Sequence, residues 1–284
     1  MPWTFTSDLP AFLAAARPAL AADPVVNTSL MTVVDALERR GPDAYGSDAP
    51  LFGWWTDQQA IDSDADAAGV LVHTPPYPLL TGALPAGAVR ELGAALTAEP
   101  LLAGVEALSV RREDAGPLAG AWGRPSEVVE ENRLYRLAGL IAPDPAPAGK
   151  ARPAGEADLP LLLDWITAFK QESGEGGAAS EEALRDRFSY GGMLLWEDAG
   201  SPVSLAGFSR PLGAMSRIGP VYTPPELRGR GYAAGVTYAA TGAAHAAGAH
   251  EVLLFADLKN PTSNGVYRRL GYTPVEDRVE VALK

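Results

Sequence analysis

The sequence contains no cysteine, and only three of its 284 residues are histidine. A chain without cysteine has no disulfides, no thiolate nucleophile and no cysteine-based metal site. The three histidines, His73, His245 and His250, are poorly spaced for a metal cluster. No apolar run reaches the roughly 18 residues of a membrane span, and the first residues lack the basic and apolar blocks of a secretion signal. We therefore expect a cytoplasmic protein that binds no metal and has no membrane partner.

Positive charge is scarce as well. The chain has 23 Lys and Arg against 35 Asp and Glu, for a net charge of −12, and most of the excess lies in residues 1–149, with 19 acidic and 9 basic residues. A nucleic-acid-binding surface is basic, so we expect no nucleic-acid partner. An acidic surface is compatible with a cationic small amine as substrate, and we expect a monomer or a homodimer.

A strand, a sharp turn and a helix follow one another around residue 225. The β-prone residues before Pro224-Pro225 predict a strand that ends there, because proline cannot donate to a sheet ladder. Arg228-Gly-Arg-Gly231 then opens an Ala-rich helix that we expect to continue to about Gly248. Glycines at such a turn let the backbone approach a ligand closely, and the first helical N–H groups lack internal partners. The turn therefore predicts a site for phosphate or pyrophosphate.

A second segment lies about 30 residues downstream. It begins as a buried strand (252–257), and a short helix follows with Asn260 as N-cap, Pro261 at the first helical position and Gly271 as the stop.

The run of Pro, Ala and Gly at 142–149 predicts a linker between domains 1–141 and 150–284. Patterning in the second domain predicts a strand at 151–153, helices from 158 and 180, a loop over 172–179 between them, and strands at 193–197, 203–210, 216–222 and, last, 275–283. The first domain predicts a similar order. Helices are expected at 9–20, 25–38, 86–98 and 114–122, and strands at 51–55, 69–73, 78–81, 105–109 and 132–137.

Two motifs of the second domain resemble the GNAT superfamily of acetyl-CoA-dependent N-acetyltransferases. Arg228, Gly231 and Ala233 match its Arg/Gln-x-x-Gly-x-Gly/Ala loop, and a second set matches its Asn-x-x-Ser/Ala-x-x-x-Tyr-x-x-x-Gly-Tyr/Phe signature: Asn260, Ser263, Tyr267, Gly271 and Tyr272. The resemblance covers essentially all of 150–284 and implies an α/β (α+β) GNAT fold. The similar order in residues 1–141 resembles a degenerate copy, so that the chain consists of two GNAT-like domains, each a mixed, mostly antiparallel sheet flanked by helices. Residues 81–89 contain no basic residue and no such loop, so we do not expect the first domain to bind acetyl-CoA.

The resemblance implies acetyl-CoA as co-substrate and a set of residues that contact it. The backbone of Val221 and Thr223, on a strand that splays from its neighbour after Gly219-Pro220, pairs with the pantetheine arm, and the loop binds the pyrophosphate. The full cofactor-binding set is Val221, Tyr222, Thr223, Arg228, Gly229, Arg230, Gly231, Tyr232, Ala233, Asn260, Ser263 and Tyr267. Tyr267 is expected to donate a proton to the departing thiolate, because a phenol (pKa about 10) stays protonated where a thiol (pKa about 8.5) begins to ionise. Tyr272 is expected in the core.

The acceptor amine must lose a proton before it attacks, since an alkyl amine is almost fully protonated at neutral pH. The candidate bases are Glu172 and Asp257, with Tyr222 and Glu197 as weaker candidates. The sequence therefore predicts transfer of acetyl to a primary amine of a small molecule or peptide by direct attack. Two alternatives stay open, namely a non-catalytic acyl-CoA sensor and an acyltransferase that uses a longer acyl-CoA.

Overall fold

The computed structural model describes residues 2–57, 67–174 and 178–284. The chain divides into two compact units: unit 1 comprises Met1–Arg133 with Glu276–Lys284, and unit 2 comprises Leu134–Val275. Part of the predicted loop over 172–179 lies outside the described residues, and Glu172 itself belongs to the last turn of a helix rather than to a loop.

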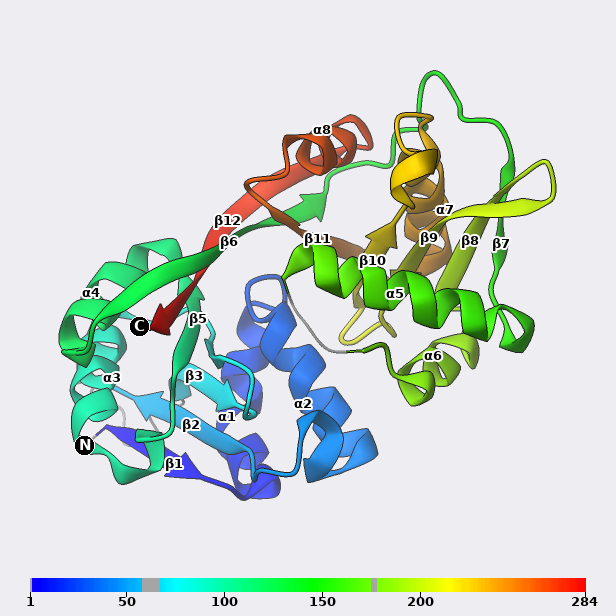
Figure 1. Ribbon diagram of the computed structural model, residues 1–284. Coiled ribbons are helices and arrows are strands. Elements are labelled where there is room, and N and C mark those ends of the chain that lie inside the picture. The colour runs from blue at the N-terminus through cyan, green and yellow to red at the C-terminus, as the bar shows by residue number, and fades with distance from the viewer. Residues whose placement is uncertain (1, 58–66, 175–177) are drawn as a thin grey trace. The chain divides into compact units, whose positions relative to one another are not determined.

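The two halves of the chain repeat one order of elements, strand-helix-helix-strand-strand-strand-helix-strand-helix-strand (Figure 1). In the first half these are β1 (Trp3–Thr6), α1 (Leu9–Ala22), α2 (Thr28–Arg40), β2 (Leu51–Thr56), β3 (Ala67–His73), β4 (Leu79–Thr81), α3 (Ala86–Ala98), β5 (Ala107–Arg111), α4 (Arg112–Trp122) and β6 (Ser126–Leu137). In the second half they are β7 (Lys150–Pro153), α5 (Leu159–Ser173), α6 (Glu181–Phe188), β8 (Met193–Asp198), β9 (Ser201–Phe208), β10 (Met215–Tyr222), α7 (Tyr232–Ala246), β11 (Glu251–Asp257), α8 (Pro261–Arg269) and β12 (Tyr272–Leu283). The predicted helices and strands are confirmed to within a few residues at most ends, and β1 is an element that the sequence analysis missed.

Within each unit the strands pair in a mixed, mostly antiparallel arrangement, as predicted. In unit 1 the strand order is β1-β2-β3-β4-β5-β12-β6, with β4 and β5 parallel. In unit 2 the order is β7-β8-β9-β10-β11-β6-β12, with β10 and β11 parallel. The end of β12 pairs with β5 in antiparallel register, Arg278 opposite Arg111. The strands β6 and β12 are thus divided between the units: the start of β6 and the end of β12 belong to unit 1, and the other part of each strand belongs to unit 2.

The compact units therefore divide within β6 and β12, whereas the predicted boundary lies at 142–149. That Pro/Ala-rich segment belongs to unit 2, where Trp196 Nε1 donates to the carbonyl oxygen of Ala148 at 2.7 Å. Strand pairing over long sequence distances decides this division, and composition does not report it.

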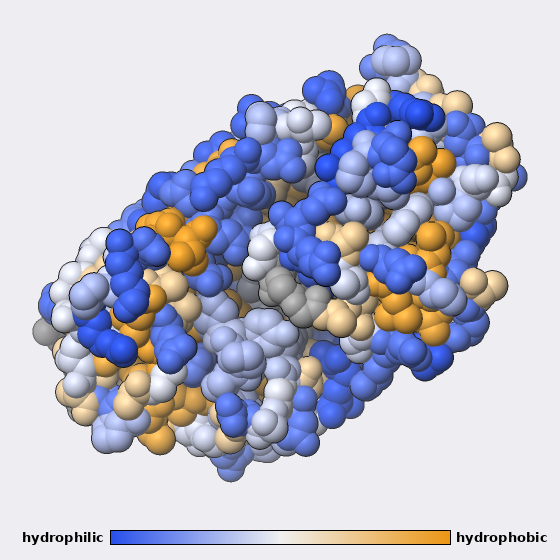
Figure 2. Space-filling view, viewed as in Figure 1, coloured by the Kyte–Doolittle hydropathy of each residue, from blue (hydrophilic) through white to orange (hydrophobic). Residues whose placement is uncertain are grey.

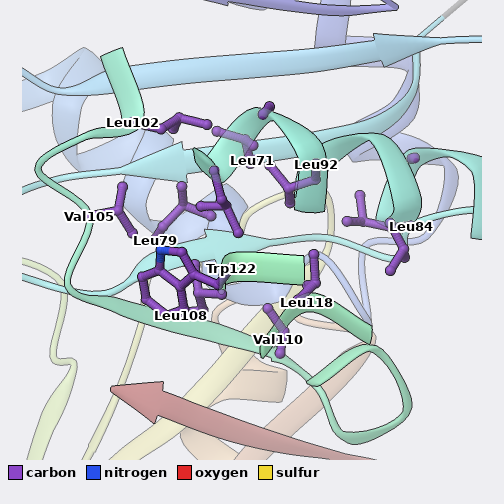
Figure 3. Close-up of a cluster of buried hydrophobic side chains, with 14 of the residues drawn as sticks. Leu71, Leu79, Leu84, Leu92, Leu102, Val105, Leu108, Val110, Leu118 and Trp122 are labelled. Carbon is purple, nitrogen blue, oxygen red and sulfur yellow. The ribbon is translucent and has the colours of Figure 1, made fainter. Parts of the chain in front are cut away.

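Unit 1 has its main core between its sheet and helices α3 and α4. Leu71 and Leu79 from the strands meet Leu92 of α3 and Leu118 of α4, and all four side chains are fully buried (Figure 3). Burial of such side chains contributes about 1.5–3 kcal/mol each. A second cluster on unit 1 includes Phe12 of α1 and Phe52 of β2, whose rings stack at 5.0 Å between centroids.

Unit 2 has one core on each face of its sheet, because successive residues of a strand point to opposite faces. Leu195 and Leu205 pack with α5 and α6, while Leu194 and Ala206 pack with α7 and α8. Figure 1 shows α5 and α6 on one side of β8–β10 and α7 on the other. The face drawn in Figure 2 is mostly hydrophilic with small separate apolar patches. No helix of the described residues is long and apolar enough to cross a membrane.

Candidate functional site

The parallel strands β10 and β11 separate partway along their length. Their register pairs join Met215–Ile218 to Glu251–Leu254 and stop there, although β10 continues to Tyr222 and β11 to Asp257. On its other side β10 still pairs with β9 through Val221 and Tyr222, after an irregularity between Ile218 and Val221. The backbone of Val221 and Thr223 on the β11 side thus has no strand partner in this register, and an extended amide chain fits such an edge. The predicted splay after Gly219-Pro220 is confirmed.

The turn after β10 positions the N-terminus of α7. Gly229 and Gly231 both adopt positive φ, +78° and +80°, which residues with a Cβ avoid. Gly231 is the N-cap of α7 and makes no side-chain cap, so the first N–H groups of this 15-residue helix are not capped by a side chain. A Cβ on Gly231 would lie 3.4 Å from Cβ of Pro147. The backbone fits an anion such as a pyrophosphate.

The side chains of this turn point in different directions. Arg230 is exposed. Tyr232 is buried, and its hydroxyl donates to Asp198 at the end of β8. Ala233 is half-buried in the first turn of α7.

Arg228 folds back onto the strand and the helix α5. Its Nε donates to the carbonyl oxygen of Thr223 at 2.8 Å, and its Nη2 lies 2.6 Å from Oε2 of Glu172. The Tyr222 hydroxyl donates to the other oxygen of Glu172 at 3.2 Å. Burial, and then the nearby Glu172 carboxylate, raise the pKa of Tyr222. The structure therefore brings Glu172, Tyr222 and Arg228 together as one hydrogen-bonded group at the end of β10.

The other predicted bases have structural partners. Asp257 is exposed at the end of β11, and its Oδ1 accepts a hydrogen bond from the backbone N–H of Lys259 at 2.8 Å, which shapes the turn into α8. Glu197 forms an ion pair with Arg152 at 2.7 Å, on β8 and β7.

The short helix α8 begins as predicted. Asn260 Oδ1 accepts from the backbone N–H of Ser263 at 3.1 Å, which is the predicted N-cap. Asn264, which the sequence analysis missed, is buried and joins three elements. Its side chain accepts from the Tyr135 hydroxyl at 2.7 Å and donates to the carbonyl oxygens of Asp257 and Asn260, each at 2.7 Å. A buried asparagine needs such partners, but only the fold reveals them.

Tyr267 lies on α8 with its ring against Tyr135 and Tyr272, at 6.5 and 6.3 Å between centroids. Its side chain is 9% exposed, and burial raises its pKa to about 12. No hydrogen bond of its hydroxyl to another described residue is found. Tyr272, by contrast, is confirmed as a core residue, because it is buried and its hydroxyl bonds to Thr241 at 2.7 Å. Burial therefore keeps the Tyr267 phenol protonated at neutral pH.

Unit 1 differs at the corresponding strands. Arg278, from β12, is buried, and its Nη2 donates to the carbonyl oxygen of Thr81 on β4 at 2.6 Å and to that of Ser109 on β5 at 3.1 Å. Its Nη1 pairs with Glu276 at 3.0 Å. A protein side chain thus bridges β4 and β5, the strands that match β10 and β11 in order.

A hollow of about 420 Å³ lies beside α5, and Asp164, Thr167 and Gln171 are among the residues that line it. Within the described part of the chain, no group of three or more His, Cys, Asp or Glu side chains is placed to hold a metal ion.

Among known protein families, the acetyltransferase (GNAT) family matches residues 159–272 of this chain. A GNAT-family acetyltransferase from Colwellia psychrerythraea is similar in structure over 100% of both chains, with a TM-score of 0.66 and 13% identity. A GCN5-related N-acetyltransferase from Sphaerobacter thermophilus gives a TM-score of 0.63 at 18% identity and covers 99% of this chain and 95% of its own. One from Kribbella flavida gives 0.56 at 18% identity over 76% of this chain and 86% of its own. A search of curated proteins found no match.

The structural likenesses establish the fold of the whole chain, and the family match covers the segment that contains the splay, the glycine turn and Tyr267. Residues 159–272, in the second half of the chain, therefore match the acetyltransferase domain of the GNAT family.

Proposed function

We propose that this chain transfers the acetyl group of acetyl-CoA to a primary amine of a small molecule or peptide by direct attack. The observation that supports this most is the separation of β10 from β11 beside the glycine turn. A strand edge for the pantetheine amides and a helix N-terminus for the pyrophosphate stand next to each other there, and a coenzyme A molecule needs both.

The cofactor is held mainly by backbone in this proposal. Val221 and Thr223 pair with the pantetheine, and the N–H groups from Gly229 to Ala233 bind the pyrophosphate. Arg230, which is exposed, adds positive charge. Arg228 reaches the phosphates only if its contacts to Glu172 and Thr223 rearrange. Asn260 and Ser263, at the start of α8, lie alongside the pantetheine.

The chemistry needs a neutral amine and a stabilised leaving group. The neutral amine nitrogen attacks the thioester carbonyl carbon, the C–S bond breaks, and the thiolate takes a proton from Tyr267. The acetylated nitrogen then loses its extra proton, which restores the phenol of Tyr267. Glu172, directly or through water, removes the proton from the amine, and Asp257 is the second candidate for this role. Tyr267 is suited to donate because its raised pKa keeps it protonated at neutral and mildly alkaline pH.

A sensor function is the second candidate, because both oxygens of Glu172 already accept hydrogen bonds within the chain. Release of thiol from acetyl-CoA, measured with DTNB over a panel of amines, separates the two. Catalysis predicts turnover, while a sensor binds acetyl-CoA without turnover. Matched thioesters of longer chain test the third possibility, a larger acyl group.

Calorimetric titration tests the cofactor site directly. We expect saturable acetyl-CoA binding at micromolar to sub-millimolar concentration. Gly231→Val should abolish it, since the position has φ of +80° beside Pro147, whereas Gly248→Val, with a φ of +99° and open space beyond the other end of α7, is the matched control and should retain binding. Wild-type protein that does not bind acetyl-CoA, or equal binding by both variants, would contradict the proposal.

A further inference from the structure

A guanidinium group lies on the sheet of unit 2 beside the place where β10 leaves β11. It belongs to Arg187 of α6, and its Nη1 donates to the carbonyl oxygen of Phe208 on β9 at 3.2 Å. A Cβ built on Gly207 would lie 2.4 Å from this nitrogen and 3.0 Å from the carbonyl oxygen of Gly219. Arg187 Nη1 and the Gly219 carbonyl therefore lie against the same point of the sheet, on the side that α5 and α6 cover.

Gly219 is the first residue of β10 beyond its register with β11. Under the proposed function the thioester end of acetyl-CoA enters at this opening, since Val221 and Thr223 pair with the pantetheine. The guanidinium thus stands close to the position where an acceptor amine must approach the acyl carbon.

Among the residues that the structure describes, no direct ion pair of Arg187 with a carboxylate is found, although Asp186 and Tyr190 lie near enough to favour its charged form in part. The neighbouring carboxylate, Asp186, lies 2.9 Å from Arg210 Nη2, and Arg210 also donates to Ser189 and lies 4.2 Å above the ring centroid of Tyr190. A guanidinium group has five N–H donors, and one of those of Arg187 donates to the carbonyl oxygen of Phe208. The residue as a whole is half-buried, but its guanidinium lies deep enough that desolvation lowers its pKa. The nearby Asp186 and Tyr190 offset only part of the cost of desolvating this cation, because its pKa is lowered on balance.

We propose that Arg187 binds the carboxylate of the acceptor, and that the acceptor is a free amino acid, with its carboxylate close to the amine that is acetylated. The inference rests on the proposed function and narrows its substrate class. A guanidinium takes a carboxylate through two parallel N–H···O bonds, and this fixes the orientation of the substrate as well as its charge. A peptide N-terminus lacks a carboxylate at this distance and is disfavoured.

Gly207 makes the arrangement possible. Any side chain at this position would occupy the space that the Arg187 guanidinium fills, at 2.4 Å from Nη1. Met193, opposite Gly207 in the register of β8 and β9, closes the same space with its methyl group. The space beside Gly207 is thus bounded by the Gly219 carbonyl, the Met193 methyl group and the Arg187 guanidinium.

Pairs of substrates that differ only in the carboxylate provide the test. Thiol release from acetyl-CoA is measured with L-tyrosine and tyramine, L-histidine and histamine, L-lysine and cadaverine, and L-phenylalanine and phenethylamine. Wild-type protein should turn over at least one amino acid with a kcat/KM at least 100-fold above that of its amine. This comparison requires no variant. Amines that equal or exceed their amino acids overturn the inference, and so does acetyl-CoA binding without turnover of any amino acid.

Two variants then test the residue. Arg187→Met should lower kcat/KM for the amino acid at least 100-fold, leave that of the paired amine within about threefold, and leave the Kd of acetyl-CoA unchanged. Arg187→Lys should recover part of the loss. Arg185→Met, on the same helix but exposed and paired with Glu181, is the control and should match wild type. Equal losses with amino acid and amine contradict the role. If acetyl-CoA itself does not bind to the wild type, the proposed function fails, whereas binding with amine-only turnover sinks this inference alone.

Discussion

Replacement of Tyr267 by phenylalanine removes one hydroxyl and little else. The hydroxyl makes no hydrogen bond to another described residue, and the ring keeps its contacts with Tyr135 and Tyr272. The fold therefore loses no internal hydrogen bond, and we expect the free energy of unfolding at pH 7 to change by less than about 1 kcal/mol. In the reaction, however, the variant lacks the donor that meets the departing thiolate.

The size of the catalytic loss follows from that role. Loss of one preorganised donor to a developing anion costs about 10²–10³ in kcat, or about 3–4 kcal/mol. We expect Tyr267→Phe to lower kcat about 100-fold in thiol release, with the calorimetric Kd of acetyl-CoA within about twofold of wild type. Full turnover, or a loss in affinity as large as the loss in turnover, would refute the assignment of Tyr267 as the proton donor.

The same variant changes the response to alkaline pH. The folded-state pKa of Tyr267 is about 12, above the unfolded value of about 10, so the stability that comes from the neutral phenol is complete below pH 10 and is lost as the pH rises toward 12. A difference of about two between the folded-state and unfolded-state pKa corresponds to about 2–3 kcal/mol of stability. Wild-type protein should therefore lose more free energy of unfolding between pH 10 and pH 12 than Tyr267→Phe does, by about 2–3 kcal/mol in denaturant unfolding.

Tyr272→Phe is the matched control. It deletes a hydroxyl that bonds to Thr241 in the core, so it should cost about 1 kcal/mol of stability and leave kcat nearly unchanged once the protein is folded. A catalytic loss as large as that of Tyr267→Phe would mean that the two tyrosines act only through packing.

Three further predictions concern other contacts. Arg278→Met leaves the half-buried Glu276 without its ion-pair partner, so the free energy of unfolding should fall by about 3–5 kcal/mol in denaturant titration, and unchanged stability would be a contrary result. Wild-type protein should bind one acetyl-CoA per chain, and a second equivalent site would contradict the expectation for the first domain. Glu172→Gln removes an exposed ion pair with Arg228, so stability should change by less than about 1 kcal/mol, whereas turnover at neutral pH should fall about 10²-fold if Glu172 is the base, and undiminished turnover would rule it out. Asn264→Ala leaves the buried Tyr135 hydroxyl without its partner and removes one of the hydrogen bonds that the Asp257 and Asn260 carbonyl oxygens accept. It should cost about 1–3 kcal/mol, and a thermal midpoint equal to that of wild type would speak against this contact network.

Local patterning determined much of the second half in advance. Apolar periodicity, the prolines after β10, the glycines at 229 and 231 and the Asn260 cap act over a few residues, so the sequence alone placed the helices, the glycine turn and the position of Tyr267. The separation of β10 from β11 was also predictable, because the resemblance of two motifs fixed which strands are neighbours.

Tertiary structure decided what depends on partners far apart in the chain. Arg187 has no local signal, since its meaning comes from Gly207 and Gly219 on two strands. Arg228 meets Glu172 56 residues away, and Arg278 bridges carbonyls at Thr81 and Ser109, 197 and 169 residues away. The division of units 1 and 2 within β6 and β12 has the same origin. Turns, caps and helix faces are set by neighbours within about one turn of chain, whereas the counter-ion of a buried charge and the partner of a strand edge are chosen only when distant segments come together.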